Sequence, residues 1–315
     1  MYNWLPILPA VTLATIGAIL SLAIISVGLV WLFIRSLSGR DVDRRVVFLF
    51  IAIATTAPIL FPLKFEEKAT PIVKNVFDKV ESLPPGSHVL ISFDFDPAVA
   101  PEVGPMANAF LRHCLQRDLK VICMSLWATG QSLMAHSIDT IVKVEFPNKQ
   151  DGVDWVSLGF KAGGVGVLNV IATDFKKMFP TDVNGVPYDS LPIMDGIRSC
   201  ADLDLILAVG SGSPGAKEWV LYVGDPRDVP LGAGVSAVSA PQLYPYYPKQ
   251  LLGLLGGVKG AAEYESELIR RYPRFAKVDT PAIVMMGPQT LAHVVVIMFI
   301  IIGNVSYFRT RRKRR

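Results

Sequence analysis

Residues 70–126 read TPIVKNVFDKVESLPPGSHVLISFDFDPAVAPEVGPMANAFLRHCLQRDLKVICMSL, and the alternation of element types in this stretch predicts the fold. Residues 70–82 and 101–117 repeat apolar side chains at the spacing of one helix face. Residues 88–95 and 119–126 have the short, apolar character of strands that are covered on both faces. Alternating helices and strands predict a layered α/β domain with a mainly parallel sheet.

The alternation continues through the rest of the 64–288 segment. Further strands are predicted at 154–160, 203–209, 218–223 and, as a short one, 235–239. Further helices are predicted at 130–142, 165–178 and 258–271. Such sheets bind ligands beyond the C-terminal ends of their strands, so functional residues are expected directly after each strand.

Three apolar runs flank this domain. Residues 7–34 and 46–63 hold no charge, and 289–308 is followed at once by RTRRKRR. About 20 helical residues cross a bilayer core. The sequence therefore predicts three transmembrane helices, of which the first two form an N-terminal hairpin within residues 1–63. The chain start has no basic residue and no small-x-small cleavage pattern follows the first run, so it is not typical of a signal peptide.

The distribution of Lys and Arg predicts the orientation of these spans. Residues 35–45 hold four arginines against two aspartates, the tail 309–315 holds six basic residues, and 1–34 holds none. With three spans, the 35–45 loop and the C-terminus lie on one side of the membrane. Because basic loops stay in the cytoplasm, we expect both there, and the N-terminus and 64–288 outside.

The same distribution argues against nucleic acid as a partner. The 315-residue chain has a formal charge of +4, and the tail and the 35–45 loop contribute +6 and +2, which leaves −4 for 64–288. A nucleic-acid-binding domain needs a basic surface. The positive charge lies instead beside the predicted spans, where it orients the chain and can attract anionic lipid.

Two carboxylates follow the first predicted strand of the domain. Strand alternation places Asp94 and Asp96 on one face with Ser92. A carboxylate pair at a strand end can hold a divalent cation or share a proton, which would suit a hydrolase. Alternatively, Asp96 caps the next helix and Asp94 is hydrogen-bonded nearby. No further acidic cluster and no His/Cys spacing make a metal site specific, so none is predicted.

A glycine-rich turn follows the strand at 154–160. Backbone N–H groups at the start of the next helix could hold a small anion, assisted by a lysine. The candidate ligand-binding residues are Lys161, Gly163 and Gly164. The alternative is a tight strand-to-helix turn without a ligand.

A second glycine-rich turn, GSGSPG at 210–215, follows the strand at 203–209 and contains Ser211 and Ser213. It matches G-x-G-x-x-G, but the strand predicted from Glu218 leaves no room for the helix of a dinucleotide site. A flexible turn or a small-anion site is expected, and no cofactor is identified.

An unusual stretch rich in tyrosine, proline, leucine and glycine covers 239–265. Tyrosine suits the headgroup level of a membrane, and small residues let helices approach closely. The candidate interface residues are Tyr244, Tyr246, Tyr247, Leu251, Leu252, Leu254 and Leu255. The alternative is a buried loop and a short helix.

The cysteine content is low and odd in number. Cys114 and Cys123 fall among apolar neighbours, which favours buried free thiols. An oxidising exterior would permit one disulfide and leave the third cysteine, Cys200, or another unpaired.

Residues 83–97 read LPPGSHVLISFDFDP, and residues 251–265 read LLGLLGGVKGAAEYE. Together with the last span, these two stretches resemble an uncharacterised family of bacterial integral membrane proteins. The resemblance covers most of residues 83–308. It implies a bacterial inner (cytoplasmic) membrane location and a single integral unit with an extracytoplasmic α/β domain. It implies no catalytic residues.

These features favour a binding or assembly component of a membrane protein complex, since no complete catalytic constellation is present. The expected partners are the lipid bilayer and either other membrane proteins or a second copy of the chain. The alternatives are a membrane-bound hydrolase at Asp94 and Asp96, and a domain that senses a small ligand at the glycine turns.

Overall fold

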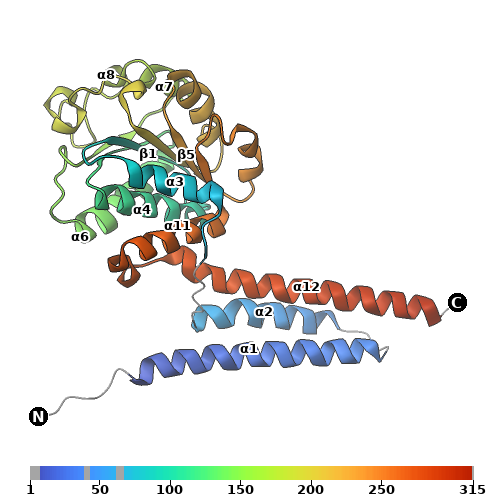
Figure 1. The fold of residues 1–315 in the computed structure, drawn as a ribbon. Helices are drawn as coiled ribbons and strands as arrows, with labels where there is room; N and C mark the ends of the chain where they lie inside the picture. The colour runs from blue at the N-terminus through green and yellow to red at the C-terminus, as the bar shows by residue number, and fades with distance from the viewer. Residues whose placement is uncertain (1–7, 39–42, 62–66, 314–315) are drawn as a thin grey trace, which may run out of the picture. The chain divides into compact units, whose positions relative to one another are not determined.

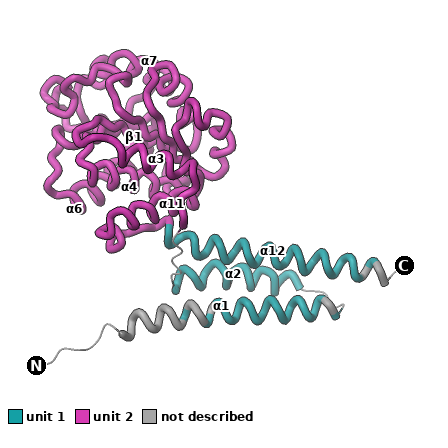
Figure 2. Tube along the Cα trace, viewed as in Figure 1, with its two compact units in different colours: residues 1–65, 283–315 teal, residues 66–282 magenta. Residues whose placement is uncertain are grey.

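The computed structural model describes residues 8–38, 43–61 and 67–313 (Figure 1). The chain forms two compact units (Figure 2): a helical unit, residues 1–65 and 283–315, and an α/β unit, residues 66–282. Parts of the predicted basic segments, namely Arg40, Asp41 and the last two arginines, lie outside the described residues.

The α/β unit is built on one six-stranded, fully parallel sheet with the strand order β3-β2-β1-β4-β5-β6. Its strands are β1 (His88–Asp94), β2 (Lys120–Ser125), β3 (Trp155–Phe160), β4 (Leu205–Gly210), β5 (Leu231–Val235) and β6 (Gly253–Gly256). The predicted α/β class and parallel sheet are confirmed. Strands β2 and β3 extend the sheet on one side of β1. The chain then returns to β4, on the other side of β1, and β5 and β6 extend the sheet in that direction.

Helices cover both faces of the sheet (Figure 1). One layer consists of α3 (Pro71–Ser82), α4 (Ala100–Gln116) and α11 (Gly257–Arg271), which pack on one another. The other layer contains α7 (Val165–Ile171), α8 (Phe175–Met178) and a helical run of α9 (Ala216–Trp219), the π-helical Val220–Gly224 and α10 (Asp225–Arg227). Helix α5 (Ala128–Ser137), the π-helical Ile138–Val142 and α6 (Lys143–Glu145) connect β2 to β3.

Because helices cover both faces of the sheet, its strands carry apolar residues at successive positions. Every residue of β1 after His88 is buried. Leu90, Ile122 and Val156 join the core that α7 and the α9–α10 run cover. A strand with both faces in a core needs apolar residues at successive positions, as the sequence of β1 and β2 indicates.

Two predicted strands are wrong. Residues 218–223 are helical, within the α9–α10 run, although their aromatic and β-branched side chains favour a strand. The strand expected at 235–239 lies earlier, as β5. Strand β6 falls inside the tyrosine- and leucine-rich stretch, for which the sequence predicts no strand. A Cβ on Gly253 would lie 2.2 Å from the carbonyl oxygen of Ile72, so glycine lets β6 pass directly beneath α3.

The helical unit contains α1 (Leu8–Leu37), α2 (Arg44–Leu60) and most of α12 (Pro281–Lys313). Helix α12 begins eight residues before the predicted span at 289. Among the described residues, only the Pro281–Arg309 part of α12 is long and apolar enough to cross a membrane. By length and composition, the described residues therefore contain one candidate membrane-spanning helix and not the three predicted: α2 has only 17 residues, and the described apolar part of α1 is limited to Leu22–Ser36.

Candidate functional site at the carboxyl edge of the sheet

The two halves of the sheet meet between β1 and β4, and the chain leaves these strands toward opposite faces. Asp94 and Gly210, at the ends of the two strands, are register partners. A Cβ on Gly210 would lie 2.9 Å from the carbonyl oxygen of Asp94, so glycine is required for this approach. In sheets of this strand order, ligands bind in the crevice outside the carboxyl ends of the strands at this switch point.

Asp94 is fully buried beneath this crevice, and its carboxylate accepts three hydrogen bonds. The N–H of Leu126 donates to Oδ1 over 2.7 Å, and Trp219 Nε1 donates to Oδ2 over 2.8 Å. The Ser92 hydroxyl also donates to Oδ2. Burial raises the pKa of Asp94 to about 6, against the lowering effect of these donors. The carboxylate thus ties β1 to the loop after β2 and to the helical run after β4.

Asp96 has a separate role at the start of α4. Its Oδ1 accepts hydrogen bonds from the N–H groups of Ala98 and Val99, at 2.9 and 3.3 Å. In the described part of the chain, no group of three or more His, Cys, Asp or Glu is arranged to hold a metal ion. Because Asp94 is closed off from solvent and the Asp96 carboxylate is bonded to the turn before α4, this geometry does not favour the hydrolase site expected at the pair.

The loop after β4, residues 211–215, is held on two sides. Ser213 Oγ and the Gly215 N–H donate to the two carboxylate oxygens of Glu218, each over 2.8 Å. From the loop after β2, Trp127 Nε1 donates to the carbonyl oxygen of Pro214 over 2.7 Å. These contacts fix the loop before any ligand arrives.

A cavity of about 410 Å³ lies beside this loop. Its walls come from the loop after β4, the first turn of α9 and the loop after β5. The polar side chains that line it are Ser213, Lys217, Glu218, Ser239 and Gln242. We call it the carboxyl-edge cavity. Small-molecule sites have volumes of roughly 300–1,000 Å³, so the carboxyl-edge cavity is large enough for a small ligand.

The loop after β5 is also anchored. Glu102 of α4 accepts a hydrogen bond from the N–H of Ala237 over 2.8 Å. Ser236 Oγ donates to Ser239 Oγ over 3.1 Å. Both loops that form the carboxyl-edge cavity are therefore positioned by carboxylates of neighbouring helices.

The structure brings the two predicted glycine turns together, but it does not gather all their candidate residues. A Cβ on Gly164 would lie 3.9 Å from Pro214 Cδ, and Gly163 and Gly164 have φ of +136° and +55°. Lys161 lies elsewhere, with Nζ 5.8 Å from the centroid of the Phe179 ring. The N–H of Ser211 donates to the carbonyl oxygen of Asp94 over 3.3 Å. Of the predicted ligand-binding residues, Ser213 alone lines the carboxyl-edge cavity.

The predicted interface residues divide into exposed and buried groups. Tyr244 is 54% exposed, while Tyr246 and Tyr247 are half-buried and the Tyr247 hydroxyl accepts a hydrogen bond from Asn75 Nδ2 over 3.0 Å. Leu251, Leu254 and Leu255 are buried in the core around β6, and Leu252 is half-buried. These three leucines pack inside the unit because β6 is a strand of the sheet, so they do not form an exposed contact surface.

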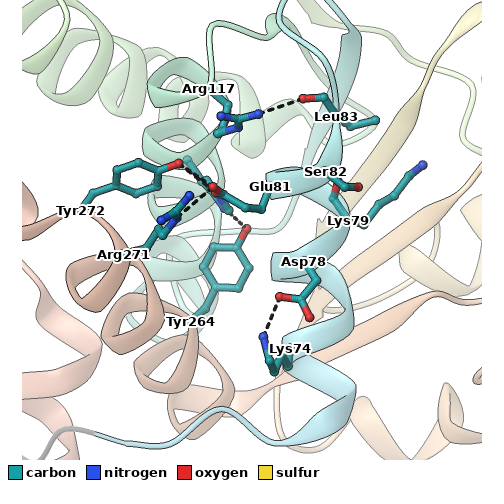
Figure 3. Close-up of polar contacts among 11 residues, drawn as sticks. Lys74, Asp78, Lys79, Glu81, Ser82, Leu83, Arg117, Tyr264, Arg271 and Tyr272 are labelled. Carbon is teal, nitrogen blue, oxygen red and sulfur yellow. Dashed lines mark hydrogen bonds and ion pairs between the residues drawn. The ribbon is translucent and has the colours of Figure 1, made fainter.

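A polar cluster around the buried His113 lies on the other side of the unit, near the C-terminal ends of α3, α4 and α11 (Figure 3). His113 is 0% exposed: Nε2 is 2.9 Å from Glu81 Oε2, and Nδ1 is 2.7 Å from the Tyr264 hydroxyl. Arg271 Nε and the Tyr272 hydroxyl donate to the Glu81 carboxylate over 3.0 and 2.8 Å. Figure 3 shows these two side chains pointing toward Glu81. We call these five residues the His113 cluster.

Protonation in the His113 cluster follows from burial and neighbouring charge. Burial lowers the pKa of His113 to about 4, although Glu81 acts to raise it. Burial acts to raise the pKa of Glu81, but the hydrogen bonds from His113, Tyr272 and Arg271 outweigh it and lower that pKa. A neutral imidazole fits this arrangement, since Nε2–H donates to the carboxylate and Nδ1 accepts from the Tyr264 hydroxyl.

A larger depression, of about 840 Å³, lies in the long segment that connects α7 to β4. Its polar groups largely satisfy one another: Lys176 pairs with Asp189, and the Tyr188 hydroxyl donates to the carbonyl oxygen of Ile197. This connecting segment contacts the start of β1, where His88 Nε2 is 2.9 Å from the carbonyl oxygen of Ile193. It therefore belongs to the amino edge of the sheet, away from the switch point.

Sequence reasoning missed Lys217 and Glu218 because a strand was expected there. The overlooked signal is the spacing of Ala216, Trp219, Val220 and Val223, which are all buried. Positions i, i+3, i+4 and i+7 share one helix face. Because a helix follows residues 210–215, the argument that a strand from Glu218 leaves no room for a helix after the GSGSPG turn is also wrong. All three cysteines are buried free thiols, as the apolar neighbours of Cys114 and Cys123 predict for those two.

No protein-family model matches this chain, and neither a curated protein nor a solved structure matches it.

Proposed function

We propose that this protein is a membrane-anchored module whose α/β unit binds a small, uncharged polar molecule in the carboxyl-edge cavity. The observation that carries the proposal is the position of this cavity at the carboxyl edge of the sheet, one strand from the switch point. It lies between the anchored loops after β4 and β5, which supply hydroxyl, amide and backbone groups. A ligand-sensing or ligand-binding role is thereby favoured over assembly through the tyrosine- and leucine-rich stretch.

The charge of the ligand is inferred from Glu218. Its carboxylate already accepts the Gly215 N–H at the start of α9, where a phosphate would otherwise be held by backbone N–H groups. A second anion beside Glu218 would be repelled. Lys217 on the same wall balances the charge of Glu218. Hydroxyl or amide groups of a neutral molecule are therefore the best match to Ser213, Ser239 and Gln242.

A binding role also agrees better than hydrolysis with the groups that line the cavity. The Ser213 hydroxyl points to Glu218, but the same carboxylate caps α9, and no histidine lines the cavity. The three-residue arrangement of a serine hydrolase needs a base that is itself oriented by a third group. Asp94 is fully buried and does not line the cavity.

Occupancy of the cavity can be tested with paired Ser→Trp variants of the full-length protein in mild detergent. We expect a neutral polyhydroxy or amide compound to bind the parent, and a ligand at one hundred times its Kd stabilises a protein by about 2.7 kcal/mol. Ser239→Trp should abolish this stabilisation because the indole fills the cavity. Thermal unfolding with a panel of neutral sugars and amides, and with their phosphorylated or carboxylated analogues, measures the effect.

The control variant is Ser190→Trp, which fills the larger depression at the amino edge. It should leave the ligand-dependent stabilisation unchanged. Stabilisation by the anionic analogues alone, or its loss in Ser190→Trp but not in Ser239→Trp, would contradict the proposal.

We further propose that all three helices of the helical unit lie in the bilayer. Helices α1, α2 and α12 share an apolar core that includes Leu29, Ala54 and Val295. Their outer faces are apolar as well: Val27 is 69% exposed, Phe48 69% and Ile300 58%. Water-soluble helices seldom expose so much apolar surface, whereas lipid-facing helices do. The resemblance to bacterial membrane proteins supports a bacterial inner membrane as the site of anchorage.

The topology we propose places the α/β unit outside and the basic 35–45 loop and C-terminal tail in the cytoplasm. Ser38 and Ser190 are exposed, one in the loop and one in the α/β unit, and all native thiols are buried. A membrane-impermeant thiol reagent should label Ser190→Cys in intact spheroplasts and Ser38→Cys only after the membrane is permeabilised. The reverse pattern would show that the orientation is inverted.

A further inference from the structure

The exposed face of α12 carries a stripe of polar and apolar side chains. Gln289, His293, Val296, Ile300 and Asn304 follow one another at spacings of four, three, four and four, so they share one helix face. His293, Val296, Ile300 and Asn304 are exposed, and Gln289 is half-buried. We call these five residues the α12 seam.

The opposite face of α12 is already occupied within the unit. Leu291 is 8% exposed, Val295 0% and Ile302 3%, and Leu291 and Val295 belong to the core shared with α1 and α2. The three polar residues of the α12 seam therefore point away from the neighbouring helices. Within the described residues, the side chains of Gln289 and His293 have no hydrogen-bond partner, and Asn304 Nδ2 donates only to the carbonyl oxygen of Ile300 on its own helix.

Membrane insertion of α12 would bury His293 in hydrocarbon. A bilayer core takes about 20 helical residues, and every window of that length between Pro281 and Arg309 contains His293. Ionisable and amide side chains inside a membrane rarely face lipid, because lipid offers them no hydrogen-bond partner. The α12 seam therefore requires a protein partner with matching donors and acceptors.

We propose that this partner is the α12 seam of a second copy of the chain, in a parallel helix pair. Insertion gives every copy the same orientation, so Gln289 meets Gln289, His293 meets His293 and Asn304 meets Asn304 around a two-fold axis. Each of these side chains carries both a donor and an acceptor, the neutral imidazole included, so each can bond to its own copy. Spacings of four and three residues are those of helices packed at a small crossing angle.

Disulfide trapping of single-cysteine variants in native membranes tests this pairing. Val296→Cys and Ile300→Cys lie on the seam, and Val294→Cys and Ile301→Cys are matched controls on another exposed face. The native side chains are 41%, 58%, 48% and 44% exposed, in that order. Mild oxidation should give about tenfold more disulfide-linked dimer from the seam variants, because only seam positions bring two Cβ atoms within bonding distance.

A second measurement isolates the polar groups. In the Ile300→Cys background, His293→Leu should weaken dimer formation about three- to tenfold, the range expected for a hydrogen bond between membrane helices. Val294→Leu in the same background should leave it unchanged. Equal trapping at seam and control positions, trapping to a protein of different mass, or no trapping at all would overturn the proposal.

The inference rests on insertion of α12, which belongs to the proposed function, and alkaline carbonate extraction separates the two. Protein that stays in the membrane pellet but gives no seam-specific dimer refutes the pairing and leaves the anchor intact. Protein that is released by carbonate refutes both.

Discussion

Replacement of Asp94 by alanine is expected to lower the free energy of unfolding of the α/β unit by on the order of 4 kcal/mol, because three buried donors lose their acceptor. This carboxylate accepts hydrogen bonds from the Leu126 N–H, Trp219 Nε1 and the Ser92 hydroxyl. Water cannot replace it readily, since Asp94 and Trp219 are both 0% exposed. Denaturant unfolding of the full-length protein in detergent measures the loss.

Two variants make this result specific to the buried carboxylate. Asp96→Ala removes only the acceptor for two N–H groups of the turn before α4 and should cost about 1 kcal/mol. Asp94→Asn keeps the volume but presents an N–H group to at least one of the donors, so it should cost about 1–3 kcal/mol. If Asp94→Ala proved no more harmful than Asp96→Ala, the structural role assigned to Asp94 would be wrong.

The His113 cluster is expected to make the α/β unit lose stability in acid. The pKa of His113 is about 4 in the folded protein, below the ordinary value of 6.5. Between these values the unfolded chain binds a proton that the folded chain does not, so the free energy of unfolding falls as pH falls. The loss is about 1.4 kcal/mol per pH unit, or about 3 kcal/mol from pH 6.5 to pH 4.

The measurement compares parent and His113→Gln in denaturant unfolding from pH 7 to pH 4. The variant should be less stable than the parent at pH 7, because a buried hydrogen-bonded cluster is disturbed, but the difference should shrink by about 3 kcal/mol at pH 4. His136→Gln, at an exposed position on α5, is the control and should follow the parent. A constant difference between parent and His113→Gln across the range would refute the assigned titration.

Asp94 acts in the opposite direction over nearly the same range. Its folded-state pKa of about 6 lies above the ordinary value of 3.8, so the folded protein binds the extra proton and gains stability as pH falls from 6 to 4. The two groups oppose each other, so comparison of the variants with the parent is more informative than the pH profile of the parent. Asp94 lies at the carboxyl edge of the sheet, near the candidate site, and His113 lies at the opposite edge.

The order of elements was largely predictable because it depends on local pattern. Helix α3 and strands β1 and β2 were predicted to within about two residues, since their apolar spacing and the turn at Pro84-Pro85-Gly86 are short-range signals. The errors occurred where two signals disagreed. Residues 218–223 have strand-forming side chains but helical spacing, and packing of Trp219 and Val220 against the sheet decided for the helix.

The candidate site depends on contacts between residues far apart in the chain. Nothing in the sequence near Asp94 indicates that Leu126 and Trp219 will donate to it, or that Trp127 will hold Pro214. These contacts follow from the strand order, which places β4 beside β1 after an intervening segment of more than one hundred residues. Register between distant strands is a tertiary property, so local periodicity cannot reveal it.

The sequence alone determined the α/β class, the parallel sheet and the presence of an apolar C-terminal helix long enough to cross a membrane, because each follows from the periodicity or length of a continuous run of residues. The tertiary structure decided what those runs do. It placed Asp94 in a buried hydrogen-bond network and Leu251, Leu254 and Leu255 in the core. It also formed the carboxyl-edge cavity between the loops after β4 and β5. Burial and hydrogen bonding depend on which segments meet, and only the folded chain defines that.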